Sequence, residues 1–331
     1  MPKKKLNLFL KILITAFLTV VLLTVLGRNH FFLGTVLVIG RWLLLILGVV
    51  FIYFTKKRVT PKWLRVSVIV SVLMISIEFG WVKIHEHRLK STEAEIELSL
   101  MTYNLFFKNK SPNSIIARIK DSNPDILVVQ ELTPKWKIDL DNSIGASYLY
   151  KKLIPLHGTH GIGIYSKHPI SNHQILNNDN NLPFAQIIEL KIGNKDIQLI
   201  NAHLASPAKA VENPESFFEF YRINYKIIEQ QIIVLNKLAI ESKDQFDAQV
   251  LIGDLNTTPY EPLFREMKNE WTNLNASVGS RFNFNFPNSS RIIPFLTLDY
   301  IMLRGNVKCL ETKIVEGGSS DHLALTGLVK I

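Results

Sequence analysis

Hydrophobic residues are distributed unevenly along the chain, and their pattern changes near residues 83 to 95. Before this point long apolar runs dominate. After it short apolar runs alternate with polar stretches, which is typical of a globular domain. We therefore predict an N-terminal region over residues 1–83, a linker over 84–94 and a second domain over 95–331.

Three apolar stretches in the first region are each long enough to form a transmembrane helix. They cover about residues 6–26, 36–54 and 64–82, close to the roughly 20 residues with which a helix crosses the hydrocarbon core. The first stretch could instead be a cleaved signal peptide, but no small-residue cleavage site follows it. The pattern predicts an all-α, multi-pass membrane region.

Basic residues beside these stretches predict the orientation of the chain. Three lysines precede the first stretch and five basic residues separate the second from the third, whereas the segment between the first two is nearly uncharged. Because positively charged flanks remain in the cytoplasm, we expect an integral membrane protein whose second domain is extracytoplasmic.

The formal net charge of +10 could suggest a partner such as nucleic acid. Residues 1–94, however, contain 14 Lys and Arg against 3 Asp and Glu, while residues 95–331 contain 24 against 25. The second domain therefore has no general attraction for polyanions, although a local basic groove stays possible. The sequence indicates no protein partner.

Short strands and three helices are predicted in the second domain. The helices cover residues 111–125, 213–242 and 258–269, and the strands outnumber them. Side chains capable of metal binding or acid–base chemistry adjoin these strands. Four strands end at Asn104, at Glu131, at His203, and at Asp254 with Asn256, another contains Asp299, and the last begins with Asp321 and His322. Strand ends of a packed sheet hold such groups rigidly, so we expect one site. Taken alone, Asp254 and Asn256 could also cap the helix that follows them.

These residues and their surroundings resemble the endonuclease/exonuclease/phosphatase superfamily, to which DNase I, abasic-site endonucleases and neutral sphingomyelinases belong. The resemblance covers about residues 95–331 and rests on TYNLF, VVQEL, HGIGIYSKHPI, NAHLASP, IGDLNTTP, LDYIML and SSDHLAL, in that order. It implies an α/β fold, the DNase I-like four-layer sandwich of two mixed β-sheets flanked by helices. It also implies a metal-dependent hydrolase of phosphoric esters.

The resemblance further implies a role for each residue. Asn104 and Glu131 would bind a divalent cation, and oxygen ligands of this kind suit Mg²⁺ or Mn²⁺. Asp321 would be either a metal ligand or part of the base. The remaining catalytic positions would be Asp254 for the attacking water, Asn256 and His203 for the phosphate, and His322 held by Asp299.

The sequence leaves the substrate open. A membrane-anchored nuclease, a phospholipid or sphingomyelin phosphodiesterase, and an enzyme for small phosphoesters are all compatible with these motifs. The bilayer itself is an expected partner of the N-terminal region. A non-catalytic binding protein that keeps the fold is a further alternative, but every residue that the reaction needs is present.

Overall fold

The computed structural model describes residues 12, 14–22, 46–48, 66, 68–70, 72–73, 96–207, 216–259, 261–274, 284–290 and 292–331. The chain divides into two compact units, one formed by Met1–His85 with Thr258–Arg265 and the other by Glu86–Thr257 with Glu266–Ile331. Most of the three predicted spans lies outside the described residues. Within the described residues, no helix combines the length and apolar character needed to cross a membrane.

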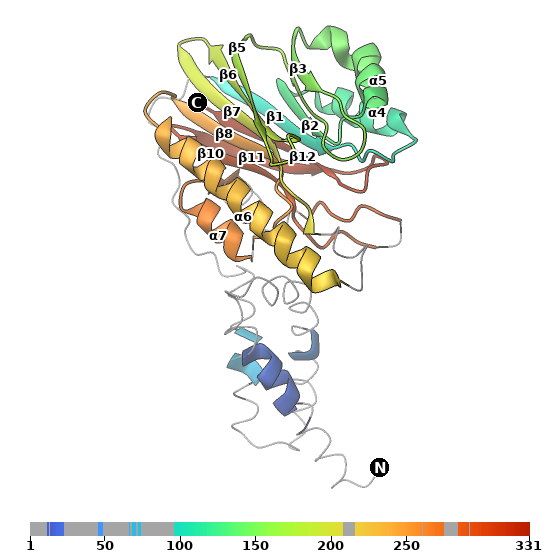
Figure 1. Ribbon diagram of the computed structural model, residues 1–331, viewed down its shortest axis with the longest axis vertical. Coiled ribbons are helices and arrows are strands. Elements are labelled where there is room, and N and C mark those ends of the chain that lie inside the picture. Colours follow the sequence, from blue (N-terminus) through green and yellow to red (C-terminus); the bar gives the residue numbers. More distant parts are fainter. Residues whose placement is uncertain are drawn as a thin grey trace. The chain divides into compact units, whose positions relative to one another are not determined.

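Two mixed six-stranded sheets form the second unit (Figure 1). The strand order in the first sheet is β11-β12-β1-β2-β4-β3. These strands span Lys308–Val315, Ala324–Lys330, Glu97–Asn104, Ile126–Gln130, Ile162–Ser166 and Tyr150–Ile154, respectively. β1 and β2 run parallel, and the other neighbours run antiparallel.

The second sheet repeats this arrangement, with the strand order β5-β6-β7-β8-β10-β9. Its strands span Ile170–Asn177, Pro183–Ile192, Lys195–His203, Ala248–Asp254, Asp299–Gly305 and Thr272–Asn273, respectively. Here β7 and β8 form the parallel pair. Each sheet therefore contains one central parallel pair, and the site residues predicted at Asn104 and at His203 and Asp254 end strands of these pairs.

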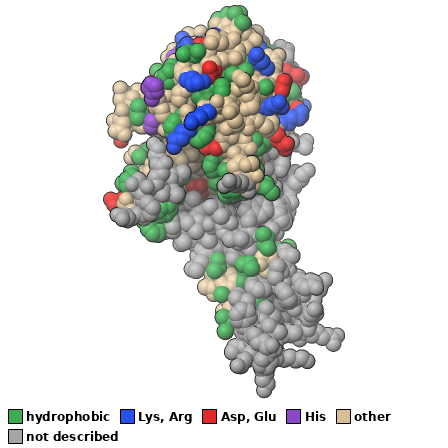
Figure 2. Space-filling view, turned by 90° about the vertical axis from the view of Figure 1, so that its right-hand side faces the viewer, with side chains coloured by type: hydrophobic (Ala, Val, Ile, Leu, Met, Phe, Trp, Pro, Cys, Tyr) green, Lys and Arg blue, Asp and Glu red, His purple; other side chains and the backbone are tan. Residues whose placement is uncertain are grey.

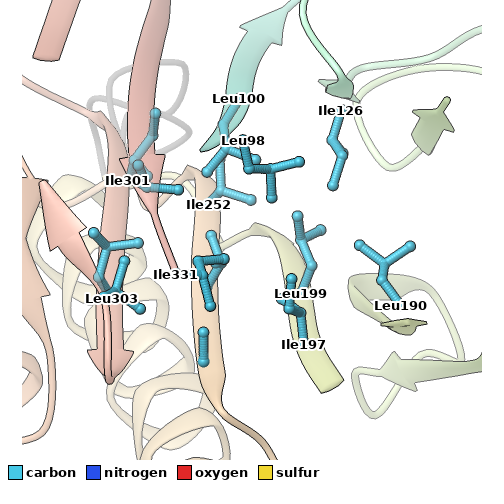
Figure 3. Packing of buried hydrophobic residues seen from close by; sticks show 14 of the residues in the cluster. Leu98, Leu100, Ile126, Leu190, Ile197, Leu199, Ile252, Ile301, Leu303 and Ile331 are labelled. Atoms are coloured by element: carbon cyan, nitrogen blue, oxygen red, sulfur yellow. The ribbon is translucent and has the colours of Figure 1, made fainter. Parts of the chain in front are cut away.

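Aliphatic side chains from both sheets form the main core (Figure 3). Alternate residues of the central strands point into it, as the period of two along a strand requires. Leu98 and Leu100 of β1 face Leu199 of β7 and Ile252 of β8, and all four are fully buried. This dry layer holds the sheets together below the ends of the strands.

Helices cover the outer faces of the two sheets (Figure 1). α4 (Pro112–Ser122) and α5 (Pro134–Ile144) pack on the first sheet through a second cluster that includes Ile119, Trp136 and Tyr165. A short 3₁₀ helix, Gly145–Ser147, follows α5. α6 (Phe217–Glu241) covers the second sheet, and α7 spans Pro262–Lys268. The expected sandwich of two mixed sheets flanked by helices is confirmed.

The face that carries α4 and α5 has mixed charge (Figure 2). Lys and Arg side chains are interspersed there with Asp and Glu. Several of them form ion pairs along the helices, such as Lys135 with Asp139 and Lys137 with Asp141. The described residues of this face therefore do not form the continuous basic surface that is expected where a protein binds nucleic acid.

Candidate active site

Strand register and side-chain alternation bring the predicted site residues to one end of the core. His203 pairs with Asp254 across β7 and β8, and Asp254 pairs with Asp299 across β8 and β10. Each lies an even number of residues from a core position on its strand, so its side chain points between the sheets. The same holds for Asn104 on β1. The site thus closes the end of the hydrophobic core.

A hydrogen-bond network connects Asn104, Asp254 and Glu131. The Nδ2 of Asn104 donates to Oδ2 of Asp254 at 3.0 Å and to Oε1 of Glu131 at 3.4 Å. Asn104 and Asp254 are each 1% exposed. Because Asn104 and Asp254 belong to different sheets, this amide bridges the two halves of the sandwich.

The segment after β1 wraps around Glu131. Oε2 of Glu131 accepts a hydrogen bond from the backbone N–H of Phe107 at 2.8 Å, and Oδ1 of Asn104 accepts one from Phe106. Glu131 itself follows β2 and has a φ of 57°, a left-handed conformation that is unusual for a residue with a side chain. Such conformations persist where the surroundings fix them, and they occur often at functional sites.

A glycine permits the close approach of β7 and β8 beside Asp254. Gly253 has a φ of 141°, and a Cβ at this position would collide with the carbonyl oxygen of Ala202 on the neighbouring strand. Any larger residue would push the strands apart one position before Asp254. The Gly-Asp order in the sequence is therefore a requirement of the site's geometry.

His322 is held by Asp299 at the second side of the site. Its Nδ1 lies 2.8 Å from Oδ2 of Asp299, and its Nε2 lies 3.8 Å from Oδ2 of Asp254. The ring packs against Phe286, with 4.8 Å between the ring centroids. The carboxylate at Nδ1 orients the ring so that Nε2 faces Asp254.

Two residues that hold this pair in place were not predicted from the sequence. Asn285 is fully buried and brackets the start of β10, because its Nδ2 donates to the carbonyl oxygen of Asp299 and its Oδ1 accepts from the N–H of Leu298. Ser320 donates to the carbonyl oxygen of Asn104 at 2.6 Å and accepts from the N–H of His322. An isolated Asn or Ser in a loop gives no sequence signal of such a role.

The other predicted residues lie at the edge of this network. Nε2 of His203 is 3.6 Å from Oδ2 of Asp254. Asn256 donates from Nδ2 to the carbonyl oxygen of Leu204, and its backbone N–H donates to Oδ1 of Asp254. α7 begins only at Pro262, so Asn256 does not cap it. Asp321 is half-buried, and its Oδ1 lies 3.5 Å from the Ser320 hydroxyl.

Burial and mutual repulsion shift the protonation equilibria of the site. Burial raises the pKa of Glu131 and of Asp321, with further increases from neighbouring carboxylates that include Asp254. Burial alone would lower the pKa of His322, but Asp299, Asp254 and Asp321 outweigh it and raise that pKa to about 10. The imidazole is therefore held in its protonated, donating form at neutral pH.

The carboxylates form a donor set that suits a divalent cation. Coulombic interaction with His203 lowers the pKa of Glu131, and that with His322 lowers the pKa of Asp321, but in both cases the effect of burial is larger. Oxygen donors concentrated in this way fit Mg²⁺ or Mn²⁺. Asp254, Asp299 and His322 also present atoms within 4.8 Å of one another. In this second group, Nδ1 of His322 already lies within hydrogen-bond distance of Asp299.

A layer of uncharged polar side chains separates the site from the aliphatic core. Gln130 donates to Oδ1 of Asn201 at 2.8 Å and accepts from the hydroxyl of Thr102 at 3.2 Å. Asn201 in turn donates to the carbonyl oxygens of Val129 and Gly163. Each of these side chains lies one or two residues before a predicted site residue: Thr102 before Asn104, Gln130 before Glu131, and Asn201 before His203. They therefore connect the strands on the core side of the site.

Comparison with known structures identifies the fold. The D. rerio TDP2 complex with a single-strand DNA product is 16% identical in sequence and has a TM-score of 0.56, covering 72% of this chain and 100% of that one. The endonuclease/exonuclease/phosphatase from Bacteroides vulgatus is 15% identical with a TM-score of 0.56, at 72% and 100% coverage. The 3′ phosphatase NExo from Neisseria, bound to a product DNA hairpin, is 16% identical with a TM-score of 0.53, at 70% and 98% coverage.

Family membership rests on the sequence itself. No protein with a curated description matches the chain. The model of the Endonuclease/Exonuclease/phosphatase family, however, matches residues 101–322, which include every site residue described above. The chain therefore belongs to the endonuclease/exonuclease/phosphatase family of phosphoester-hydrolysing enzymes.

Proposed function

We propose that this chain is a membrane-anchored, divalent-metal-dependent phosphoesterase, in which Asp and His side chains assist the attack of water on phosphorus. The observation that carries the proposal is the junction of the two sheets. There the Asn104 amide binds Asp254 and Glu131, while Asp299 holds His322 close to Asp254.

Asn104, Glu131 and Asp321 would hold Mg²⁺ or Mn²⁺. The bound cation supplies charge neutralisation for the phosphoryl oxygens. Glu131 is suited to this task because a backbone N–H and an amide already fix its two oxygens. Its raised pKa also favours a ligand with high positive charge, since an isolated carboxylate is costly at this depth.

Asp254 orients the attacking water and accepts its proton. The N–H of Asn256 and the amide of Asn104 hold its two oxygens in place. As the new oxygen–phosphorus bond forms and the ester bond breaks, protonated His322 donates its proton to the departing alcohol oxygen, and His203 contacts a phosphoryl oxygen. Fixed donors of this kind stabilise the negative charge that develops in the transition state. Asn256 adds a further amide at the phosphate.

The substrate is a phosphodiester or phosphomonoester. A lipid headgroup and nucleic acid are the two candidate substrates. Nucleic acid is supported by the DNA products bound to the D. rerio and Neisseria proteins. A binding protein without catalysis is disfavoured, because none of the required residues is replaced and they converge on one site. The three apolar stretches support a multi-pass membrane protein with an extracytoplasmic catalytic domain.

Removal of single site groups tests the proposal. We expect Asp254→Asn and His322→Ala each to lower the turnover of a phosphodiester by roughly 10²–10³-fold, the usual effect of removing one transition-state contact. A chelator should abolish activity in the unmodified protein, and Mg²⁺ should restore it. Asp139→Asn on α5 is the matched control, because it removes an acidic group outside the site. Near-normal turnover in either site variant, with folding intact by circular dichroism, would refute the assignment.

A further inference from the structure

A tight turn after β1 holds two of the proposed metal ligands. The N–H of Phe106 donates to Oδ1 of Asn104 at 3.0 Å, and the N–H of Phe107 donates to Oε2 of Glu131 at 2.8 Å. The N–H of Asn109 closes the turn by donating to the carbonyl oxygen of Phe106 at 2.8 Å. Consecutive backbone groups of one short segment, Phe106–Asn109, therefore fix an oxygen of each ligand.

Two backbone conformations at this turn need support from the surrounding structure. Phe106 has a φ of 59° and Glu131 has a φ of 57°, in the left-handed region that a residue with a side chain rarely adopts. Such conformations persist only where other contacts fix them. On the exposed side, the Asn109 side chain donates to the hydroxyl of Ser319. An exposed hydrogen bond competes with water, so a firmer anchor is expected on the buried side of the turn.

Trp136 supplies this anchor from α5. Its Nε1 donates to the carbonyl oxygen of Phe106 at 3.4 Å, and the residue is 3% exposed within the cluster that joins α5 to the first sheet. The backbone N–H of Trp136 donates to Oγ1 of Thr133, the cap of α5, at 3.2 Å. Thr133 follows Glu131 by only two residues. Trp136 therefore contacts both the turn that holds the Glu131 carboxylate and the segment that follows the Glu131 backbone.

We propose that Trp136 is a positioning residue of the metal site, which strengthens binding of the divalent cation by holding the Phe106–Asn109 turn. The inference rests on the proposed function, in which Asn104 and Glu131 are ligands of that cation. Groups that orient metal ligands have large effects on metal affinity, because displaced ligands no longer converge on the ion. Loss of the indole N–H should therefore weaken binding of the cation.

This role predicts an effect on metal affinity rather than on turnover with the metal bound. Asp254 accepts a hydrogen bond from the N–H of Asn256, and His322 is held by Asp299. These contacts involve neither α5 nor the turn after β1, so a saturating cation should restore kcat in a protein that lacks the indole N–H. A purely structural role of Trp136 would instead lower stability without a change in metal affinity.

Two replacements of Trp136 separate the effect of its hydrogen bond from that of its bulk. Trp136→Phe removes the N–H and reduces the ring, whereas 3-benzothienylalanine at this position keeps the size of the ring and loses only the N–H. Binding of Mn²⁺ to the full chain in detergent is measured by the loss of the electron paramagnetic resonance signal of free Mn²⁺. We expect both replacements to raise the Kd for Mn²⁺ by roughly tenfold, the lower end of the usual effect of groups that orient metal ligands. The kcat at saturating Mg²⁺ should stay nearly unchanged.

Trp271→Phe is the matched control. Trp271 is 2% exposed, and its Nε1 donates to Oδ1 of Asn236 on α6 at 3.1 Å. The control therefore removes the same donor from an equally buried indole at a position outside the hydrogen-bond network of the site. It should leave the Kd for Mn²⁺ unchanged, and circular dichroism checks the folding of every variant.

Equal Kd values for the unmodified chain and the 3-benzothienylalanine variant would overturn the positioning role. This holds even if Trp136→Phe binds Mn²⁺ weakly, because lost packing would then be the cause. An equal rise of the Kd in Trp271→Phe would overturn the role as well. Absence of Mn²⁺ binding by the unmodified chain would refute the proposed metal site, and the positioning role with it. Failure of the proposed function is thus distinguished from failure of the positioning role alone.

Discussion

Replacement of Asn201 by leucine will test whether the polar layer below the site positions the catalytic groups. Leucine removes three buried hydrogen bonds, to Gln130 at 2.8 Å, Gly163 at 3.1 Å and Val129 at 3.3 Å, and leaves the Gln130 amide without this acceptor. At about 1 kcal/mol for each lost bond, we expect the free energy of unfolding to fall by about 3 kcal/mol. This corresponds to a decrease in Tm of roughly 6–12 °C for a domain of this size.

The effect on catalysis distinguishes positioning from simple stability. Gln249→Leu is the matched control, because Gln249 on β8 is equally buried but donates to Gln198 and Ser242 on the side of the sheet that faces α6. We expect Asn201→Leu to lower kcat by roughly tenfold to a hundredfold, since small displacements of catalytic groups have large effects. Gln249→Leu removes two buried hydrogen bonds, so it should lower Tm by roughly 4–8 °C and leave kcat nearly unchanged.

Circular dichroism melts and initial rates, measured well below both melting temperatures, provide the comparison. If Asn201→Leu melts early but retains the kcat of the control, the polar layer contributes stability and nothing else. A proportional loss of kcat in both variants would contradict the positioning role just as clearly.

Two further predictions concern charge and topology. The pKa of His322 is raised from 6.5 to about 10 in the folded state, so its contribution to stability is complete below pH 6.5 and is lost as the pH rises towards 10. His322→Gln should therefore flatten the decline in Tm between these pH values. An unchanged slope of Tm against pH would contradict the raised pKa. An alkaline phosphatase fusion after Lys90 should be active if the catalytic domain is extracytoplasmic, and an inactive fusion that is made in normal amounts would reverse the predicted orientation.

The site residues at the strand ends were easier to predict from the sequence than the loop residues around them. Strand ends are visible in sequence because runs of β-branched residues stop abruptly at polar ones, and the register then brings His203, Asp254 and Asp299 together. The long helix α6 was also predictable from its apolar spacing. α5 was missed, since its apolar residues are few, although Thr133 caps it with a hydrogen bond to the N–H of Trp136.

Contacts between distant loops were outside the reach of sequence reasoning. Asn285 and Ser320 act through backbone groups of residues that lie far away in the chain or across a turn. Their side chains are common in loops for unrelated reasons, so their type alone gives no signal. The polar layer was hidden for a similar reason, because a buried Gln or Asn is recognised only when its partner on the other sheet is known.

The hydrogen bond from Ser320 to the carbonyl oxygen of Asn104 also has a consequence for biosynthesis. It joins residues that are 216 positions apart, and the Asn104–Asp254 bond joins residues that are 150 positions apart within the same span. Nearly the whole catalytic unit is therefore synthesised before Ser320 and His322 emerge from the ribosome. Closure of such long loops is a late event in folding. Nascent chains that stall before Ser320 should be hydrolytically silent, which delays activity until synthesis of the domain is essentially finished.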